Sequence, residues 1–372
     1  MGDRGIKQTV QSLLDRADVK INGNRPWDIK VNHPQFYSRV MAGGSLALGE
    51  SYMDGWWNCQ ALDEFFHRIL KSKLHQKIKP ISLIYTNLKA RLINLQSKTR
   101  SKKVAKKHYD LSPALYKSFL DPYNQYTCGY FKNTNDLNKA QEQKLDLICK
   151  KLKLSSKDKV LDIGCGWGGF AKFAAERYGC QVTGISISER QVKYARNFCQ
   201  GLPVTIIKSD YRDFKGTFDK VLVCGMIEHV GYKNYQTLMK TVHRRLKKGG
   251  LFLLHTIGGN RSTKSVEHWL EKYIFPNSML PSAKQITGAA ESLFRLEDWH
   301  SFGSYYDKTL MAWHQNFTKN WNKIKDYYDQ RFYRMWNYYL LCCAGAFRAE
   351  MNQLWQVVFS KGGVKEGYRS IR

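Results

Sequence analysis

Acidic residues are scarce in this chain of 372 residues. There are 31 Asp and Glu against 60 Lys and Arg, which gives a formal net charge of +29. A charge of this size says little about the fold, but it indicates an anionic partner, either a nucleic acid or the surface of an anionic membrane. Composition alone does not decide between these two partners.

Proline is also sparse, with 8 residues, and no apolar run approaches the roughly 18 residues that a membrane-spanning helix needs. Residues 1–8 are charged and have no apolar core of the kind found in signal peptides. Because 43% of the residues are hydrophobic, the chain has enough apolar surface to fold, and its length suggests about two domains. We therefore expect a folded cytoplasmic protein.

The chain has nine cysteines but no C-x-x-C pair. It therefore lacks the ligand spacing of common zinc sites, and we predict no metal site. Most of the cysteines are isolated within apolar segments, which indicates reduced and buried thiols.

From about residue 139 the sequence alternates between strand and helix patterns. Strands are expected at 159–163, 181–186, 204–207, 220–224 and 251–255, and helices at 141–154, 169–178 and 189–199. This series predicts an α/β fold with a doubly wound, Rossmann-like sheet, open and parallel, with helices on both faces. Residues 313–355 are rich in aromatic side chains and have a helical pattern.

Residues 71–107 contain twelve Lys or Arg and no Asp or Glu. Such a tract is typical of an exposed linker or basic surface, although a solvated surface without a partner is the alternative. We predict a smaller N-terminal domain at 1–92, a basic linker at 93–107 and a catalytic domain at 108–372.

A glycine-rich loop follows the first expected strand of the α/β region. Gly164, Gly166 and Gly169 match the G-x-G-x-x-G pattern, so a dinucleotide-binding enzyme is one candidate. However, residues 184–188 contain no acid where such enzymes hold the ribose. Instead, Asp162 precedes the first glycine. A carboxylate there can meet the amino group of S-adenosylmethionine, whereas it would repel a pyrophosphate.

The order strand, Asp-x-Gly-x-Gly-x-Gly, resembles the first motif of the class I methyltransferases, which use S-adenosylmethionine. The resemblance implies that Asp210, after the third strand, contacts the adenine. No proline precedes a cysteine, so the nucleophile motif of cytosine-carbon methyltransferases is absent. Residues 121–124 match the adenine-amine motif only partly. We therefore expect no nucleic-acid substrate and assign the positive charge to a membrane surface.

Several motifs together resemble the cyclopropane-fatty-acyl-phospholipid synthases. They are H-Y-D-L-S at 108–112, Y-T-C-G-Y-F at 126–131, V-L-D-I-G-C-G-W-G-G at 160–169, G-M-I-E-H-V-G at 225–231, L-H-T-I-G at 254–258 and C-A-G-A-F-R at 343–348. The resemblance extends over nearly the whole chain and includes G-E-S-Y-M-D-G-W-W at 49–57. The related but shorter mycolic acid cyclopropane synthases lack such an N-terminal region. Thr127 and Phe131 depart from the residues that are usual in the longer enzymes.

The resemblance implies that a methylene group passes from S-adenosylmethionine to the cis double bond of an unsaturated phospholipid acyl chain, with bicarbonate as the proton acceptor. It further implies a homodimer, and a peripheral association with the inner membrane to which the N-terminal domain contributes. A methyl-branched or hydroxylated product is the alternative outcome. A nucleic-acid-binding protein, supported only by the basic tract, is a third hypothesis.

The resemblance also implies site residues. Bicarbonate would be held by Cys128, Glu228, His255, the Ile257 backbone and Tyr306, and Cys343 matches a cysteine assigned to the family's active site. Methylation of an alkene needs no thiolate, however, and the apolar run around Cys343 predicts an inert thiol. The implied cofactor residues are Tyr109, Tyr126, Thr127, Val160, Leu161, Asp162, Ile163, Gly164, Cys165, Gly166, Trp167, Gly168, Ser186, Ile187, Ser188, Gln191, Asp210 and Tyr211.

Overall fold

The structure is a computed structural model that describes residues 3–74, 111–263 and 265–372. The chain divides into two compact units. The first unit combines the described part of residues 1–93 with Ser265–Pro276 and Tyr306–Asn352. The second combines the described part of residues 94–264 with Asn277–Tyr305 and Gln353–Arg372. The predicted linker at 93–107 lies outside the described residues, and two segments of the predicted catalytic domain pack with the N-terminal region.

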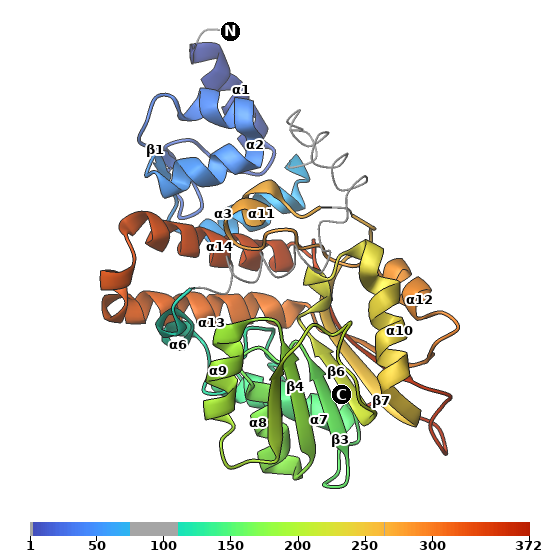
Figure 1. The fold of residues 1–372 in the computed structure, drawn as a ribbon. Helices are drawn as coiled ribbons and strands as arrows, with labels where there is room; N and C mark the ends of the chain where they lie inside the picture. The colour runs from blue at the N-terminus through green and yellow to red at the C-terminus, as the bar shows by residue number, and fades with distance from the viewer. Residues whose placement is uncertain (1–2, 75–110, 264) are drawn as a thin grey trace. The chain divides into compact units, whose positions relative to one another are not determined.

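A seven-stranded sheet forms the centre of the second unit, in the order β5-β4-β3-β6-β7-β9-β8 (Figure 1). The strands are β3 (Lys159–Ile163), β4 (Gln181–Ser186), β5 (Val204–Lys208), β6 (Phe218–Cys224), β7 (Leu246–Gly258), β8 (Arg295–Ser301) and β9 (Gln353–Ser360). Strands β3 to β7 pair in parallel, whereas β9 is antiparallel to both β7 and β8. The doubly wound α/β fold is confirmed, but the expectation of an entirely parallel sheet is wrong.

Helices cover both faces of this sheet. They are α7 (Leu137–Lys151), α8 (Gly169–Tyr178), α9 (Glu189–Phe198), α10 (Tyr235–Arg245) and α12 (Ala283–Ala290). The second unit also contains α6 (Pro113–Phe119) and the short 3-10 turns η2 (Ile227–His229) and η3 (Tyr232–Asn234). Local capping sets several of the helix starts. The Asp136 carboxylate accepts a hydrogen bond from the Lys139 amide at 2.7 Å, and Ser282 and Gln285 form a capping box at the start of α12.

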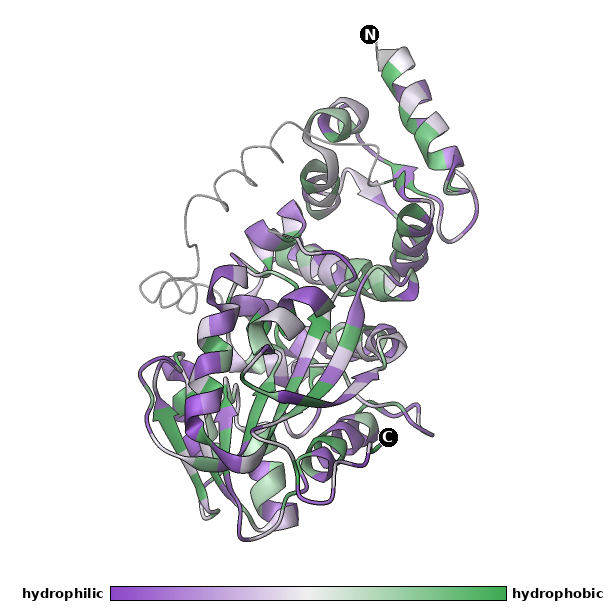
Figure 2. Cartoon of the chain, turned by 90° about the vertical axis from the view of Figure 1, so that its right-hand side faces the viewer, coloured by the Kyte–Doolittle hydropathy of each residue, from purple (hydrophilic) through white to green (hydrophobic). Residues whose placement is uncertain are grey.

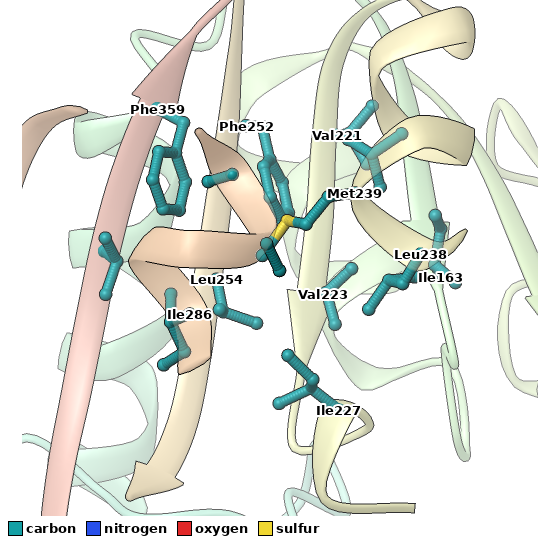
Figure 3. Close-up of a cluster of buried hydrophobic side chains, with 14 of the residues drawn as sticks. Ile163, Val221, Val223, Ile227, Leu238, Met239, Phe252, Leu254, Ile286 and Phe359 are labelled. Carbon is teal, nitrogen blue, oxygen red and sulfur yellow. The ribbon is translucent and has the colours of Figure 1, made fainter. Parts of the chain in front are cut away.

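Alternate residues of the central strands enter two separate hydrophobic cores, because successive side chains of a strand point to opposite faces. One core joins Val223 and Phe252 to α10 and α12 (Figure 3). The other joins Leu222 and Leu253 to α7, α8 and α9. Burial of both faces explains why the strand sequences are continuously apolar rather than alternating.

The first unit consists mainly of helices. Its elements are α1 (Asp3–Asp15), β1 (Lys30–Val31), α2 (Phe36–Met53), β2 (Trp57–Asn58), α3 (Leu62–Lys71), α11 (His268–Tyr273), α13 (Ser304–Asn320) from Tyr306 on, η4 (Trp321–Lys323), η5 (Lys325–Tyr327) and α14 (Gln330–Arg348). Hydrophobic and hydrophilic residues alternate along α1 (Figure 2). None of the described helices is both long and apolar enough to cross a bilayer.

Aromatic rings and one arginine hold the first unit together. The Trp57 ring centroid lies 5.2 Å from that of Tyr52 and 5.3 Å from that of Phe65. Arg348, at the end of α14, forms ion pairs with Asp63 of α3 at 2.7 Å and with Asp307 of α13 at 2.9 Å. Residues far apart in the sequence therefore share one core and one charge cluster.

We predict that Gly345→Ala destabilises the first unit. A Cβ at this position of α14 would lie 2.5 Å from the Asp63 carbonyl oxygen and 2.7 Å from Phe66 Cβ. Overpacking of this kind costs about 1–3 kcal/mol. The matched control is Gly288→Ala in α12, where a Cβ would meet no atom within 4 Å and a gain of up to about 1 kcal/mol is expected. Thermal unfolding followed by circular dichroism compares the two variants, and equal midpoints would contradict the packing described here.

Candidate active site

The glycine loop lies where the strand order of the sheet reverses, after β3 and between β4 and β6. Open α/β sheets bind ligands at this point, beyond the carboxyl ends of the strands. Gly164 and Gly166 have φ values of 82° and 53°, which favour glycine. A Cβ on Gly164 would lie 2.7 Å from Met226 Cγ, but a Cβ on Gly166 would meet no atom within 4 Å. The loop is therefore packed at Gly164 and open at Gly166, where a cofactor can approach its backbone.

The predicted cofactor residues that the structure describes all belong to the second unit, and most lie near the carboxyl ends of β3, β4 and β5. Some of these residues have a structural role: the side chains of Val160, Leu161 and Ile163 enter the two cores, and Cys165 and Trp167 are buried. Ser186 donates a hydrogen bond to Gln191 Oε1 at 3.0 Å, and Ser188 caps α9 through the Gln191 amide. Ile187 lies between Ser186 and Ser188 in the chain, Gly168 is the N-cap residue of α8, and Tyr109 lies outside the described residues.

Asp210 follows β5 as expected, but its carboxylate is already engaged. Arg212 Nη2 lies 2.6 Å from Asp210 Oδ2, and Arg212 Nε donates to Asp210 Oδ1 at 2.8 Å. Burial raises the pKa of the adjacent Tyr211 to about 12, so this phenol stays protonated at neutral pH. The implied adenine contact of Asp210 stays a prediction.

Asp162 lies on β3 with only 2% of its surface exposed. Burial raises the pKa of its carboxyl group to about 7, and the positive charge of Lys144 opposes part of this shift. A carboxyl group poised in this way can bind a cation or hold a proton near neutral pH.

Lys144 is a member of this site that the sequence analysis missed. It projects from α7, is fully buried, and donates hydrogen bonds to Gln125 Oε1 and, at 2.9 Å, to Thr127 Oγ1. Its neighbour Gln141 donates to the Thr127 carbonyl at 2.8 Å. The available signal was a lysine and a glutamine within the apolar stripe that contains Leu145 and Ile148.

Glu228 and His255 are the second pair of buried polar side chains. Glu228, in η2 after β6, is 7% exposed, and His255 on β7 is 1% exposed. Cys224 at the end of β6 pairs in register with His255, so both side chains lie at the carboxyl ends of neighbouring strands. The Ile257 amide donates to Glu228 Oε1 at 2.8 Å. Glu228 Oε2 and His255 Nε2 have no hydrogen-bond partner within the described residues.

The protonation of this pair follows from its burial. Burial raises the pKa of Glu228. Burial, together with the charges of Lys144 and Lys151, holds the pKa of His255 well below its ordinary value, so the imidazole is neutral. Gln356 Nε2 lies 3.3 Å from His255 Nδ1. With the amide nitrogen facing the ring, Nδ1 accepts and the ring proton lies on Nε2. With the amide turned over, Gln356 Oε1, which has no partner within the described residues, would accept from Nδ1–H instead.

The other predicted site residues divide between the two units. Cys128 is buried in the second unit, where its thiol donates to the Gly129 carbonyl at 3.2 Å, and the Tyr126 ring lies 5.5 Å from that of Tyr116. Tyr306 belongs to the first unit and packs on Phe347, with ring centroids 4.5 Å apart. Cys343 also belongs to the first unit, within α14. Roles for Tyr306 and Cys343 beside Glu228 stay predictions.

Sheet order, the glycine loop and the buried carboxylate define the class of protein: a class I methyltransferase that depends on S-adenosylmethionine. Comparison with known proteins gives the family. The family model for mycolic acid cyclopropane synthetase matches residues 96–357. The chain belongs to this cyclopropane synthase family.

The relatives agree with this assignment. The chain is 51% identical over 364 residues to the cyclopropane-fatty-acyl-phospholipid synthase of Escherichia coli, which covers 98% of this chain and 95% of the relative. It is 36% identical to a protein of Pseudomonas putida named probable fatty acid methyltransferase, covering 68% of each chain. The structure of the mycolic acid cyclopropane synthase CmaA1 complexed with SAH and CTAB matches with a TM-score of 0.66 and 28% identity, covering 70% of this chain and 98% of that one.

We predict that Asp162→Asn changes how stability depends on pH. The pKa of Asp162 is raised from 3.8 to about 7 in the folded chain. The folded state therefore binds this proton more tightly than the unfolded state, and the contribution is lost as pH rises through 7. Between pH 4 and 7 the variant should gain stability relative to the wild type, at a slope approaching about 1.4 kcal/mol per pH unit.

Urea unfolding at several pH values measures this slope. Asp219→Asn is the matched control, because ion pairing of Asp219 with Lys247 lowers the pKa of its carboxyl group despite partial burial. Its contribution is fully present above the ordinary pKa of 3.8 and is lost only below it, so between pH 4 and 7 the control should run parallel to the wild type. Parallel pH curves for the wild type and Asp162→Asn would contradict the raised pKa.

Proposed function

We propose that this chain transfers a methylene group from S-adenosylmethionine to the cis double bond of unsaturated phospholipid acyl chains, with bicarbonate as the proton acceptor. The products are a cyclopropane fatty acyl phospholipid and S-adenosylhomocysteine. The observation that carries the proposal is a pair of buried polar atoms, Glu228 Oε2 and His255 Nε2, at the ligand-binding edge of a methyltransferase sheet. Neither atom has a hydrogen-bond partner among the residues that the structure describes. The 51% identity to the Escherichia coli synthase supports it.

The residues fit a bicarbonate ion. Cyclopropane formation requires the removal of one proton after methyl transfer, so the site needs a base. In the tautomer with its proton on Nε2, His255 can donate a hydrogen bond to an anionic oxygen, while an ionised Glu228 Oε2 can accept the hydroxyl of the same ion. Ile257 acts indirectly, because its amide fixes the orientation of the Glu228 carboxylate.

When bound, S-adenosylmethionine supplies the methyl group and bicarbonate supplies the base. The chain's own residues position the cofactor and the proton acceptor, and they exclude bulk water. The open backbone at Gly166 gives access to the cofactor, and the buried Asp162 provides a carboxyl group for its amino group. Burial of Glu228 and His255 keeps bulk water away from the proton acceptor. No step of this scheme uses a thiolate.

We further propose that the protein acts as a homodimer at the cytoplasmic surface of an anionic membrane. The net charge of +29 supports attraction to anionic lipids, which are the substrates of the proposed reaction. The basic tract at 71–107 is the part of the sequence with the strongest local charge, and most of it lies outside the described residues.

The proposal is tested by incubating the protein with labelled S-adenosylmethionine and vesicles of unsaturated anionic phospholipid. We expect label in the acyl chains and a product heavier by one CH₂ whose NMR spectrum shows a cyclopropane ring. A methyl-branched or hydroxylated chain would instead favour the alternative suggested by the fatty acid methyltransferase relative. Absence of label from the lipid would overturn the proposal.

We predict that Glu228→Gln and His255→Ala each reduce ring formation by at least about 100-fold, since general base catalysis contributes about 10²–10⁴-fold. Both variants should still bind S-adenosylhomocysteine, because the glycine loop is unchanged. His229→Gln is the control: burial lowers the pKa of this neighbouring histidine to about 4, and we expect a structural role for it. Lipid turnover and calorimetric binding measure the two effects. Near-normal turnover in either site variant would show that the anion is held elsewhere.

A further inference from the structure

Two lysines of α7 are completely buried, and they have different surroundings. Lys144 and Lys151 lie seven residues apart, on the same face of the helix, with no exposed surface. Lys151 lies 3.3 Å from Asp298 Oδ2 and 3.0 Å from His300 Nδ1. Lys144 forms no ion pair within 4.0 Å in the described part of the chain. Instead it bonds to two neutral side chains of the segment that leads into the cofactor site. A buried cation without a contacting anion is costly, which indicates a function.

The segment held by Lys144 is fixed by side-chain contacts rather than by regular secondary structure, and the Tyr126 ring lies 5.5 Å from that of Tyr116. Residues 125–127 have no assigned helix or strand, and they are held by hydrogen bonds from α7 and from one turn. Gln141 donates to the Thr127 carbonyl, and Asp121 accepts from the Gln125 amide at 2.8 Å. Lys144 adds bonds to both side chains. Thr127 also packs closely against Gly225, the residue that follows β6. A Cβ added to Gly225 would lie only 2.6 Å from Thr127 Cγ2.

The charge of Lys144 also interacts with Asp162 in the cofactor site. Burial lowers the pKa of Lys144, while neighbouring groups act against that shift. Groups that interact electrostatically with Lys144 or Asp162 come from several elements: Asp121 and Cys128 from the loops before α7, Cys165 from the glycine loop, Cys199 after α9, Cys224 from β6 and His255 from β7. Asp121 is a second carboxyl group, but its acceptor atoms are occupied by the amides of Tyr123 and Gln125.

We propose that Lys144 is a positioning residue of the cofactor site, which fixes Thr127 and Gln125 and favours the ionised form of Asp162 for the amino group of S-adenosylmethionine. One side chain thereby couples the placement of the 125–127 segment to the charge on β3. This inference rests on the cofactor part of the proposed function and is independent of the lipid and of bicarbonate.

The test is the pH dependence of S-adenosylhomocysteine binding by the full chain, measured by calorimetry from pH 6 to 9. In the wild type, affinity should fall as pH drops through about 7, where Asp162 takes up its proton. Lys144→Gln keeps a hydrogen-bond donor but removes the charge, so the fall should begin at a pH about one unit higher. Lys144→Met should show the same shift with a further several-fold loss at every pH, because Thr127 is released.

Lys151→Met is the matched control, since it removes an equally buried lysine from the same helix face. Its binding curve should follow that of the wild type. Asp162→Asn should abolish the fall at low pH, and this comparison does not depend on the folding of any lysine variant. The inference is overturned if the curve of Lys144→Gln coincides with the wild type, if Lys151→Met shifts equally, or if the fall persists in Asp162→Asn. A wild type that does not bind S-adenosylhomocysteine would overturn the proposed function itself.

Discussion

The parallel pairing of β6 with β7 is the constraint on which the site depends. It sets Cys224 opposite His255, and the Gly225 amide donates to the His255 carbonyl at 2.9 Å as the chain leaves β6. The turn that follows places Glu228 where the Ile257 amide of β7 can reach it. Glu228 and His255 are thus positioned mainly by backbone, which a change in surface side chains would leave intact.

Around this pairing, the second unit keeps several ionisable groups away from water. Asp162, Glu228, His255 and Lys144 are all almost fully buried, at a cost that hydrogen bonds only partly offset. The two hydrophobic cores, one on each face of the sheet, supply stability that offsets the cost of burying these groups. Buried ionisable groups of this kind are typical of functional sites, where they stabilise charge during a reaction, rather than of groups with a purely structural role.

The sequence predicted the elements that have a strong local signal. The bounds of β3, β4 and α8 agree with expectation because apolar strands and glycine turns mark them. Strand β9 was missed, since its apolar residues continue the aromatic pattern of α14, and only pairing with β7 shows that it is extended. Lys144 was missed because its local signal is weak: it lies in the apolar stripe with Leu145 and Ile148, but a lysine is rarely fully buried. The motifs identified Glu228 and His255, but their unpartnered atoms could be found only from tertiary structure.

Strand β9 has a consequence for the order in which the protein matures during synthesis. It fills the place between β7 and β8, yet it follows α14 near the end of the chain. Gln356, whose Nε2 lies 3.3 Å from His255 Nδ1, lies on this strand. A ribosome-bound chain that has not yet released residues 353–360 therefore has the glycine loop but lacks the partner of its histidine. The glycine loop is therefore present in a growing chain before His255 has acquired its neighbour on β9.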